Sequence, residues 1–163
     1  MRTVAWRLRP GEDLRAALER RARIERMRAA VVLSAVGSLR DANLRLSGAT
    51  TPVLLPGSFE IVSLAGTLSL DGAHLHVAVA DRTGRVIGGH LAIGCLVLTT
   101  AEVVVAELAE WHFRRELDAQ TGYRELTIRR RYGKRAAASD RECGTTSDTG
   151  HAKESAAATV SRG

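Results

Sequence analysis

Three histidines, His74, His76 and His90, stand at positions in the sequence that a β-hairpin would bring onto one face. Side chains alternate along a strand, so His74 and His76 point to the same side of it. A hairpin centred on Thr83 would place His90 opposite His76 and diagonal to His74. Residues in such positions have Cβ atoms roughly 4.5–8 Å apart, so the three imidazoles could converge on one ion.

Three neutral imidazoles suit zinc and other divalent transition metals, and they leave a fourth position open for water, an anion or a partner's side chain. Gly88 and Gly89 leave the approach to His90 free of side chains. A β-bulge at this glycine pair would instead turn His90 to the opposite face. The alternative to a metal site is a group of histidines that packs and hydrogen-bonds on a sheet surface. His112 and His151 have no such neighbours and are assigned no function.

These histidines would be positioned by a domain made mostly of strands. A short segment at 81–85, with Asp and Gly, separates apolar runs at 73–80 and 86–99, which is typical of a hairpin. Leu14, Leu18 and Ala22 form an apolar stripe that predicts a helix over about 12–26, with its arginines, Arg15 among them, on a solvated face. Further strands are predicted at 4–8, 30–36, 42–46, 59–64, 66–70, 102–108 and 125–128, with a polar segment over 111–122. The fold class is therefore α+β, a mostly antiparallel sheet with one early helix.

The composition separates a domain at residues 1–128 from a basic tail at 129–163. The net charge of the chain is +6; the domain carries 16 Lys and Arg against 14 Asp and Glu, and the tail carries 8 against 4. The tail has too few apolar residues to offset its ordering entropy, so we expect it to be disordered. Its basic residues cluster at Arg129, Arg130, Arg131, Lys134 and Arg135. These side chains could contact DNA phosphates without reading a base sequence, or could be solvated.

Several features bear on where the protein works. No apolar run approaches the roughly 20 residues needed to span a bilayer, and the first residues lack the apolar core of a signal peptide. Two cysteines are too few for a disulfide framework. We therefore expect a cytoplasmic protein with no membrane partner. Cys95 is expected to be buried in a strand over 93–98 and to face away from the histidines.

Segments spread over residues 1–128 are similar to a known family. The matching stretches are VLSAVGS at 32–38, GSFEIVSLAGTL at 57–68, DGAHLH at 71–76, GGHL at 88–91, TAEVV at 100–104 and FRRE at 113–116. They resemble the plants and prokaryotes conserved (PPC) domain family. The resemblance implies an α/β domain that assembles as a homotrimer. It also implies that His74, His76 and His90 hold a metal, with zinc as the expected ion.

The resemblance also has implications for partners. Prokaryotic members of the family are described as candidate DNA-binding proteins. In plant members an AT-hook built on Arg-Gly-Arg-Pro precedes the domain; this chain has no such sequence, and Ser58 stands where the plant pattern has arginine. A plant segment matching 57–62 contributes to self-association and to contacts with other proteins. The corresponding candidates for trimer or partner contacts in this chain are Gly57, Phe59, Glu60 and Ile61.

The sequence leaves three functions open. The first is a homotrimeric, DNA-associated regulatory or architectural protein with a three-histidine metal site. The second is a zinc enzyme that uses a metal-bound water, for which Glu60 or Glu102 could supply an acid or base; the H-E-x-x-H motif is absent. The third is a trimer in which the metal organises the structure or takes part in sensing a ligand. No catalytic residue is assigned, and the sequence favours a non-enzymatic protein.

Overall fold

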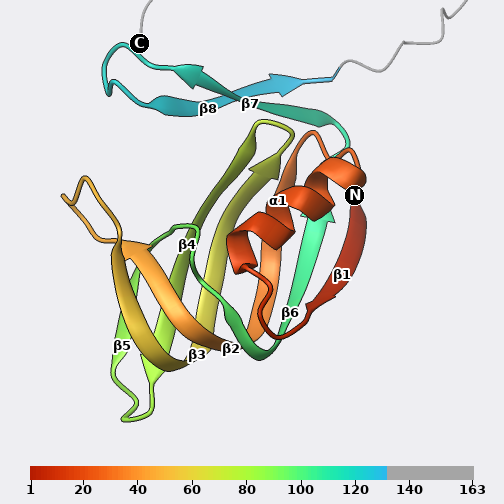
Figure 1. Cartoon of the computed structure of the whole chain (residues 1–163). Coiled ribbons are helices and arrows are strands. Elements are labelled where there is room, and N and C mark those ends of the chain that lie inside the picture. The colour runs from red at the N-terminus through yellow and green to blue at the C-terminus, as the bar shows by residue number, and fades with distance from the viewer. Residues whose placement is uncertain (132–163) are drawn as a thin grey trace, which may run out of the picture. The chain divides into compact units, whose positions relative to one another are not determined.

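The computed structural model describes residues 1–131, in which a six-stranded sheet is accompanied by one helix and a separate hairpin (Figure 1). The strands of the sheet are β1 (Arg2–Leu8), β2 (Ala30–Arg45), β3 (Val53–Ser69), β4 (Gly72–Asp81), β5 (Val86–Leu91) and β6 (Val97–Glu107). The helix is α1 (Leu14–Ile24), and the hairpin contains β7 (Trp111–Leu117) and β8 (Arg124–Arg130). This architecture confirms the mostly antiparallel α+β class that the sequence predicted.

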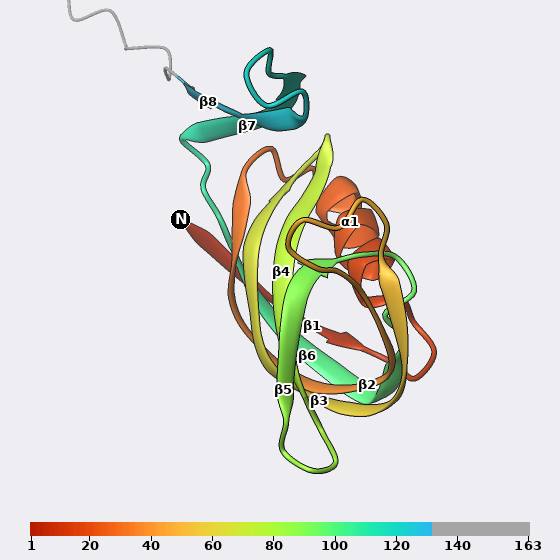
Figure 2. The same cartoon turned by 90° about the vertical axis from the view of Figure 1, so that its left-hand side faces the viewer.

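The sheet closes on itself at one end. Its strand order is β1-β6-β2-β3-β4-β5, and β5 pairs a second time with the end of β2. Figures 1 and 2 show how strongly the sheet curves to allow this contact. The β2–β5 pairing sets Leu44 opposite Leu91 and Arg45 opposite His90. An arginine and a histidine that are far apart in the sequence therefore become neighbours.

Helix α1 packs against the concave side of the curved sheet (Figure 2). Asp13 caps its N-terminus by accepting a 2.8 Å hydrogen bond from the Ala16 N–H. The predicted apolar stripe of Leu14, Leu18 and Ala22 is fully buried and joins the core. Within the part of the chain that the structure describes, no helix is long and apolar enough to cross a membrane.

The strands differ from the prediction where the sheet bends. β2 runs unbroken through the predicted gap at Gly37, because this residue adopts a φ of +137° and has no side chain to collide with the Thr100 carbonyl of β6. The predicted strand over 86–99 ends at Leu91, and a loop over 92–96 leads into β6. The predicted polar segment over 111–122 contains β7. β8 continues past the predicted domain end at 128 and includes the first two residues of the predicted tail.

Cys95 is fully buried, as predicted, but it lies in the loop between β5 and β6 rather than in a strand. Its Sγ accepts a hydrogen bond from the Asn43 N–H at 3.1 Å and donates one to the Asn43 carbonyl at 3.3 Å. Burial raises the pKa of this thiol from 9.0 to about 11. Between these two pH values the unfolded chain releases a proton that the folded chain retains, so the free energy of unfolding falls as the pH rises.

We expect Cys95 to account for a loss of about 2 kcal/mol in unfolding free energy over this pH window. Urea denaturation at a series of pH values measures the loss. The control is Cys95→Ala, in which this component of the pH dependence should vanish while the contributions of other groups remain. Equal pH slopes in the two proteins would contradict the prediction.

Candidate metal centre

The three histidines meet on the outer face of the hairpin formed by β4 and β5. His74 and His76 belong to β4, and His90 on β5 lies directly opposite His76. The intervening residue Leu75 is buried in the core, so the histidines occupy the opposite face of the strand. The predicted register is therefore confirmed, and no bulge interrupts the ladder between β4 and β5.

Their ring nitrogens are close enough to share one ion. One nitrogen from each histidine lies within 4.8 Å of the other two. Nε2 of His74 is 3.3 Å from Nε2 of His76. A tetrahedral zinc ion holds nitrogen ligands at about 2.0–2.1 Å and therefore about 3.3 Å from one another. The ring centroid of His90 lies 5.1 Å from that of His74 and 5.7 Å from that of His76.

Burial keeps two of these imidazoles uncharged at neutral pH. It lowers the pKa of His90 from 6.5 to about 4, and the positive charge of Arg15 adds to the effect. Burial, followed by the charge of Arg115, lowers the pKa of His74 in the same direction. A neutral imidazole keeps the lone pair that a metal ligand needs.

His90 also carries a polar atom that has no partner among the described residues. Its Nδ1 is buried and forms no hydrogen bond there, while its Nε2 lies 3.4 Å from the Arg15 guanidinium. A buried polar atom without a partner calls for an explanation, and a bound ion is one. The donor set fits zinc. A zinc ion held by these residues would supply a Lewis acid with one open position.

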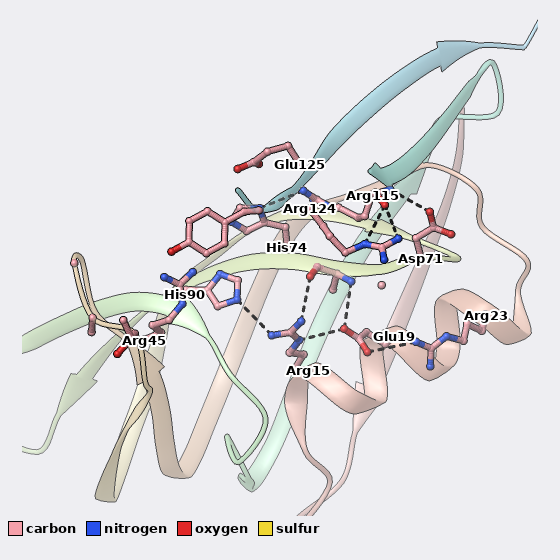
Figure 3. Close-up of a pocket in the computed structure, with 16 residues that line it drawn as sticks. Arg15, Glu19, Arg23, Arg45, Asp71, His74, His90, Arg115, Arg124 and Glu125 are labelled. Atoms are coloured by element: carbon pink, nitrogen blue, oxygen red, sulfur yellow. Dashed lines mark hydrogen bonds and ion pairs between the residues drawn. The ribbon is translucent and has the colours of Figure 1, made fainter. Parts of the chain in front are cut away.

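Arginines from distant segments surround the histidines, although no pattern in the sequence marks them as part of a site. Figure 3 shows Arg45 beside His90 and Arg115 beside His74. Arg115 donates a hydrogen bond to Thr67 Oγ1 at 2.9 Å, and its guanidinium lies 3.4 Å from His74 Nδ1. A cleft of about 670 Å³, here called the arginine cleft, is lined by Arg15, Glu19, Arg23, Arg45, Asp71, His74, His90, Arg115, Tyr123, Arg124 and Glu125, together with small residues.

Arg15 corrects the prediction of a solvated helix face. The residue is half-buried, and its guanidinium donates to the Leu91 carbonyl at 3.0 Å and pairs with Glu19 at 3.1 Å. Arg15 and Glu19 are four residues apart on a helix, a spacing that predicts an ion pair between them. The same spacing does not predict that Arg15 lies beside the histidines.

Comparison with known proteins identifies the family. The sequence model of the plants and prokaryotes conserved domain matches residues 1–109. The chain belongs to this PPC domain family. A solved structure of a hypothetical protein from Salmonella is 43% identical to this PPC protein, with a TM-score of 0.78 over 80% of this chain and 95% of that chain. A metal-containing protein from Archaeoglobus fulgidus is 30% identical, with a TM-score of 0.67 over 78% of this chain and 94% of that chain.

A curated relative of the PPC protein is much longer. The bifunctional protein GlmU of Synechococcus sp. (strain JA-3-3Ab) is 52% identical over 128 residues, which cover 78% of this chain. The chain spans about a fifth of that relative's length, 21%. The likeness therefore concerns one region of a larger protein.

Asp71 fastens the β7–β8 hairpin of the PPC protein to the turn between β3 and β4. Its Oδ2 accepts hydrogen bonds from the Arg115 backbone N–H at 3.0 Å and from the Arg114 side chain at 2.8 Å. These two hydrogen bonds, in that order, lower the pKa of the Asp71 carboxyl. Since Arg115 also reaches His74, Asp71 helps to hold this arginine at the cleft.

We expect Asp71→Ala to lower the free energy of unfolding by about 1–2 kcal/mol and to speed hydrogen exchange in β7 and β8. The stabilisation is present above the unfolded pKa of 3.8 and is lost as the pH falls through the lower folded value. The control is Glu110→Gln, which removes an exposed ion pair to Arg130 and should change stability less. Equal exchange rates in the wild type and Asp71→Ala would count against this anchoring role.

The predicted DNA-contact residues divide between the β7–β8 hairpin and the part of the chain outside the described residues. Arg129 and Arg130 lie in β8, and each pairs with an exposed glutamate at 3.2 Å. Arg131 donates to a backbone carbonyl at 3.3 Å. Lys134 and Arg135 lie outside the described residues, as does the rest of the predicted disordered tail.

Of the four residues predicted to contact a partner, two are exposed and two are buried. Gly57 and Glu60 are exposed, whereas Phe59 and Ile61 are only 8% and 6% exposed and belong to the core of this chain. Phe59 still forms part of the wall of a second cleft, of about 520 Å³, that Gly57 also lines. Ile61 is buried within its own chain, and the contact roles of all four residues stay predictions.

The two glutamates named as possible acids or bases lie elsewhere. Neither Glu60 nor Glu102 lines the arginine cleft, whose carboxylates come from Glu19, Asp71 and Glu125. An acid–base role for Glu60 or Glu102 at the histidines is therefore not supported.

Proposed function

We propose that this PPC-domain protein is a metal-binding regulatory protein in which His74, His76 and His90 hold a divalent transition metal. Zinc is the first candidate, because it accepts three imidazoles and keeps a fourth position open. The proposal is carried by one observation, the approach of three histidine nitrogens to within 4.8 Å of one another. The likeness to the metal-containing protein from Archaeoglobus fulgidus supports it.

We further propose that the protein acts as a homotrimer. Apolar side chains on β2 and β3 remain exposed in the single chain, and Leu33, Val36 and Val62 are 53%, 55% and 57% exposed. Exposed apolar side chains favour association, and identical copies can bury them through a symmetric contact.

Elemental analysis of the purified full chain, combined with its mass in solution, tests both parts. The proposal expects one metal ion per chain and the mass of three chains. Protein that retains no metal after zinc loading and dialysis would overturn the metal site. A monomer mass at micromolar concentration would overturn the trimer and leave the metal site standing.

DNA association is the second function we propose, and the observation that favours it is the basic cluster that begins in β8. The ion pairs of Arg129 and Arg130 are exposed, so they contribute little, and a DNA phosphate could replace the glutamates. Three such clusters on one trimer would gain affinity by multivalency. The binding would depend steeply on salt because it rests on phosphate contacts.

A mobility-shift assay on the full chain and on a chain ending at Arg131 tests the DNA proposal. Cutting at this point keeps β8 intact, whereas deletion from Arg129 would remove part of the strand. We expect weaker binding by the shortened chain and a smaller salt dependence. Equal binding by the two chains would show that the residues after Arg131 make no contribution.

A further inference from the structure

The arginine cleft holds positive side chains that lack an anionic partner among residues 1–131. Arg45 forms no side-chain hydrogen bond or ion pair there, although it is half-buried. Arg115, also half-buried, donates to Thr67 Oγ1 and lies near the His74 ring; the charge of Glu125 acts on it, but the two form no ion pair. Arg124 donates only to the Arg115 carbonyl, at 2.8 Å. By contrast, Arg15 and Arg23 of the same cleft both pair with Glu19.

The charges of the cleft do not balance. Five arginines line it against three carboxylates, and one of these, Asp71, is already paired with Arg114 outside the cleft. A divalent metal on three neutral histidines would add two further positive charges beside the guanidiniums. Like charges at such short range raise the free energy of the bound state. A metal ion and the arginines would therefore coexist best with an anion between them.

We propose that the arginine cleft binds a small oxyanion, a phosphate or carboxylate group, which occupies the open metal position and is held by Arg45 and Arg115. This inference rests on the proposed metal site. Figure 3 shows the two arginines beside different histidines, Arg45 next to His90 and Arg115 next to His74. An anion bound at the histidines can thus meet a guanidinium from β2 and another from β7.

The chemistry of the two arginines suits this ligand. A guanidinium offers a planar fork of N–H donors that matches two oxygens of a phosphate or carboxylate. The cleft volume of about 670 Å³ exceeds the needs of a single anionic group, so the oxyanion can belong to a larger molecule. His90 lines the same cleft, and its buried Nδ1 has no hydrogen-bond partner among the described residues.

Metal and anion should then assist each other. If the anion contacts both the metal and the arginines, each ligand raises the affinity of the other by the same factor. The metal affinity measured in a buffer free of phosphate and carboxylates should therefore be lower than in their presence. This reciprocity separates an anion site on the metal from an arginine patch that binds anions independently.

Calorimetry on the full chain provides the test, with inorganic phosphate and malonate as the two probes. We expect phosphate or malonate to bind the zinc-loaded protein and to raise its zinc affinity by at least about tenfold. Arg45→Gln and Arg115→Lys should each weaken anion binding by about tenfold. Arg82→Gln, on the exposed turn between β4 and β5, is the matched control and should leave anion binding unchanged.

Each outcome decides a separate question. Tighter binding of phosphate than of malonate would identify a phosphate group as the ligand, and tighter binding of malonate would identify a carboxylate. Either result supports the anion site. Zinc binding with the same affinity in every buffer, with no heat from either anion, would overturn the anion site and leave the metal site intact. Failure to bind zinc in any buffer would overturn the metal site on which this inference rests.

Discussion

Replacing His76 by alanine is expected to lower the affinity of the protein for Zn²⁺ by at least about a hundredfold. The change removes one of three nitrogen donors, and the two that remain leave the ion with fewer protein ligands than zinc sites require. His76 is the exposed member of the cluster, so the metal-free protein should keep its stability to within about 0.5 kcal/mol. Competition with a coloured chelator measures the affinity. Thermal denaturation with and without zinc measures the stabilisation that binding supplies.

His112→Ala is the matched control for this experiment. His112 lies in β7 opposite Arg129 and belongs to no group of ligands within the described residues. Its replacement should leave zinc affinity and the zinc-dependent rise in melting temperature unchanged. An equal loss in His112→Ala and His76→Ala would mean that zinc binds to surface histidines without a defined site.

The hairpin that carries the histidines could be predicted because its signals are local. The two-residue period of His74 and His76 fixes their common face, and the short turn that follows fixes the position of His90. The observed pairing of His76 with His90 is the one these rules predict when no bulge interrupts the two strands, and the structure shows no bulge there. The apolar stripe of α1 was equally predictable, since a helix buries one face at fixed spacing.

The rest of the site depends on contacts between distant segments. Arg45 reaches His90 only because the curved sheet brings the end of β2 against β5. Arg115 reaches His74 because hydrogen bonds to Asp71 and Thr67 help to hold it there. No residue spacing or motif in the sequence predicts either contact. Both depend on how the sheet curves and packs, which involves the whole core. The strand β7 escaped prediction for a related reason: most of its residues are polar, and it is a strand because it pairs with β8, not because it buries an apolar face.

Replacing Gly66 by alanine is expected to lower the free energy of unfolding by at least about 3 kcal/mol. Gly66 on β3 lies opposite Leu75 on β4, with a φ of +137°. A Cβ at this position would overlap the His74 carbonyl oxygen and lie 2.9 Å from Leu75 Cα. Because these are backbone atoms, no side chain can turn away, and the two strands must separate. Urea denaturation of the metal-free protein measures the loss.

Gly84→Ala separates steric overlap from backbone strain in this comparison. Gly84 also has a positive φ, +81°, but a Cβ there would meet nothing within 4 Å. Its replacement should cost only the conformational strain, about 1–2 kcal/mol. The additional loss of unfolding free energy in Gly66→Ala, compared with Gly84→Ala, therefore measures the steric overlap with β4. Since β4 carries two of the three histidines, Gly66→Ala should also weaken zinc binding while Gly84→Ala should not. Equal effects of the two substitutions on stability and on zinc affinity would rule out the close approach at Gly66 as the element that positions His74.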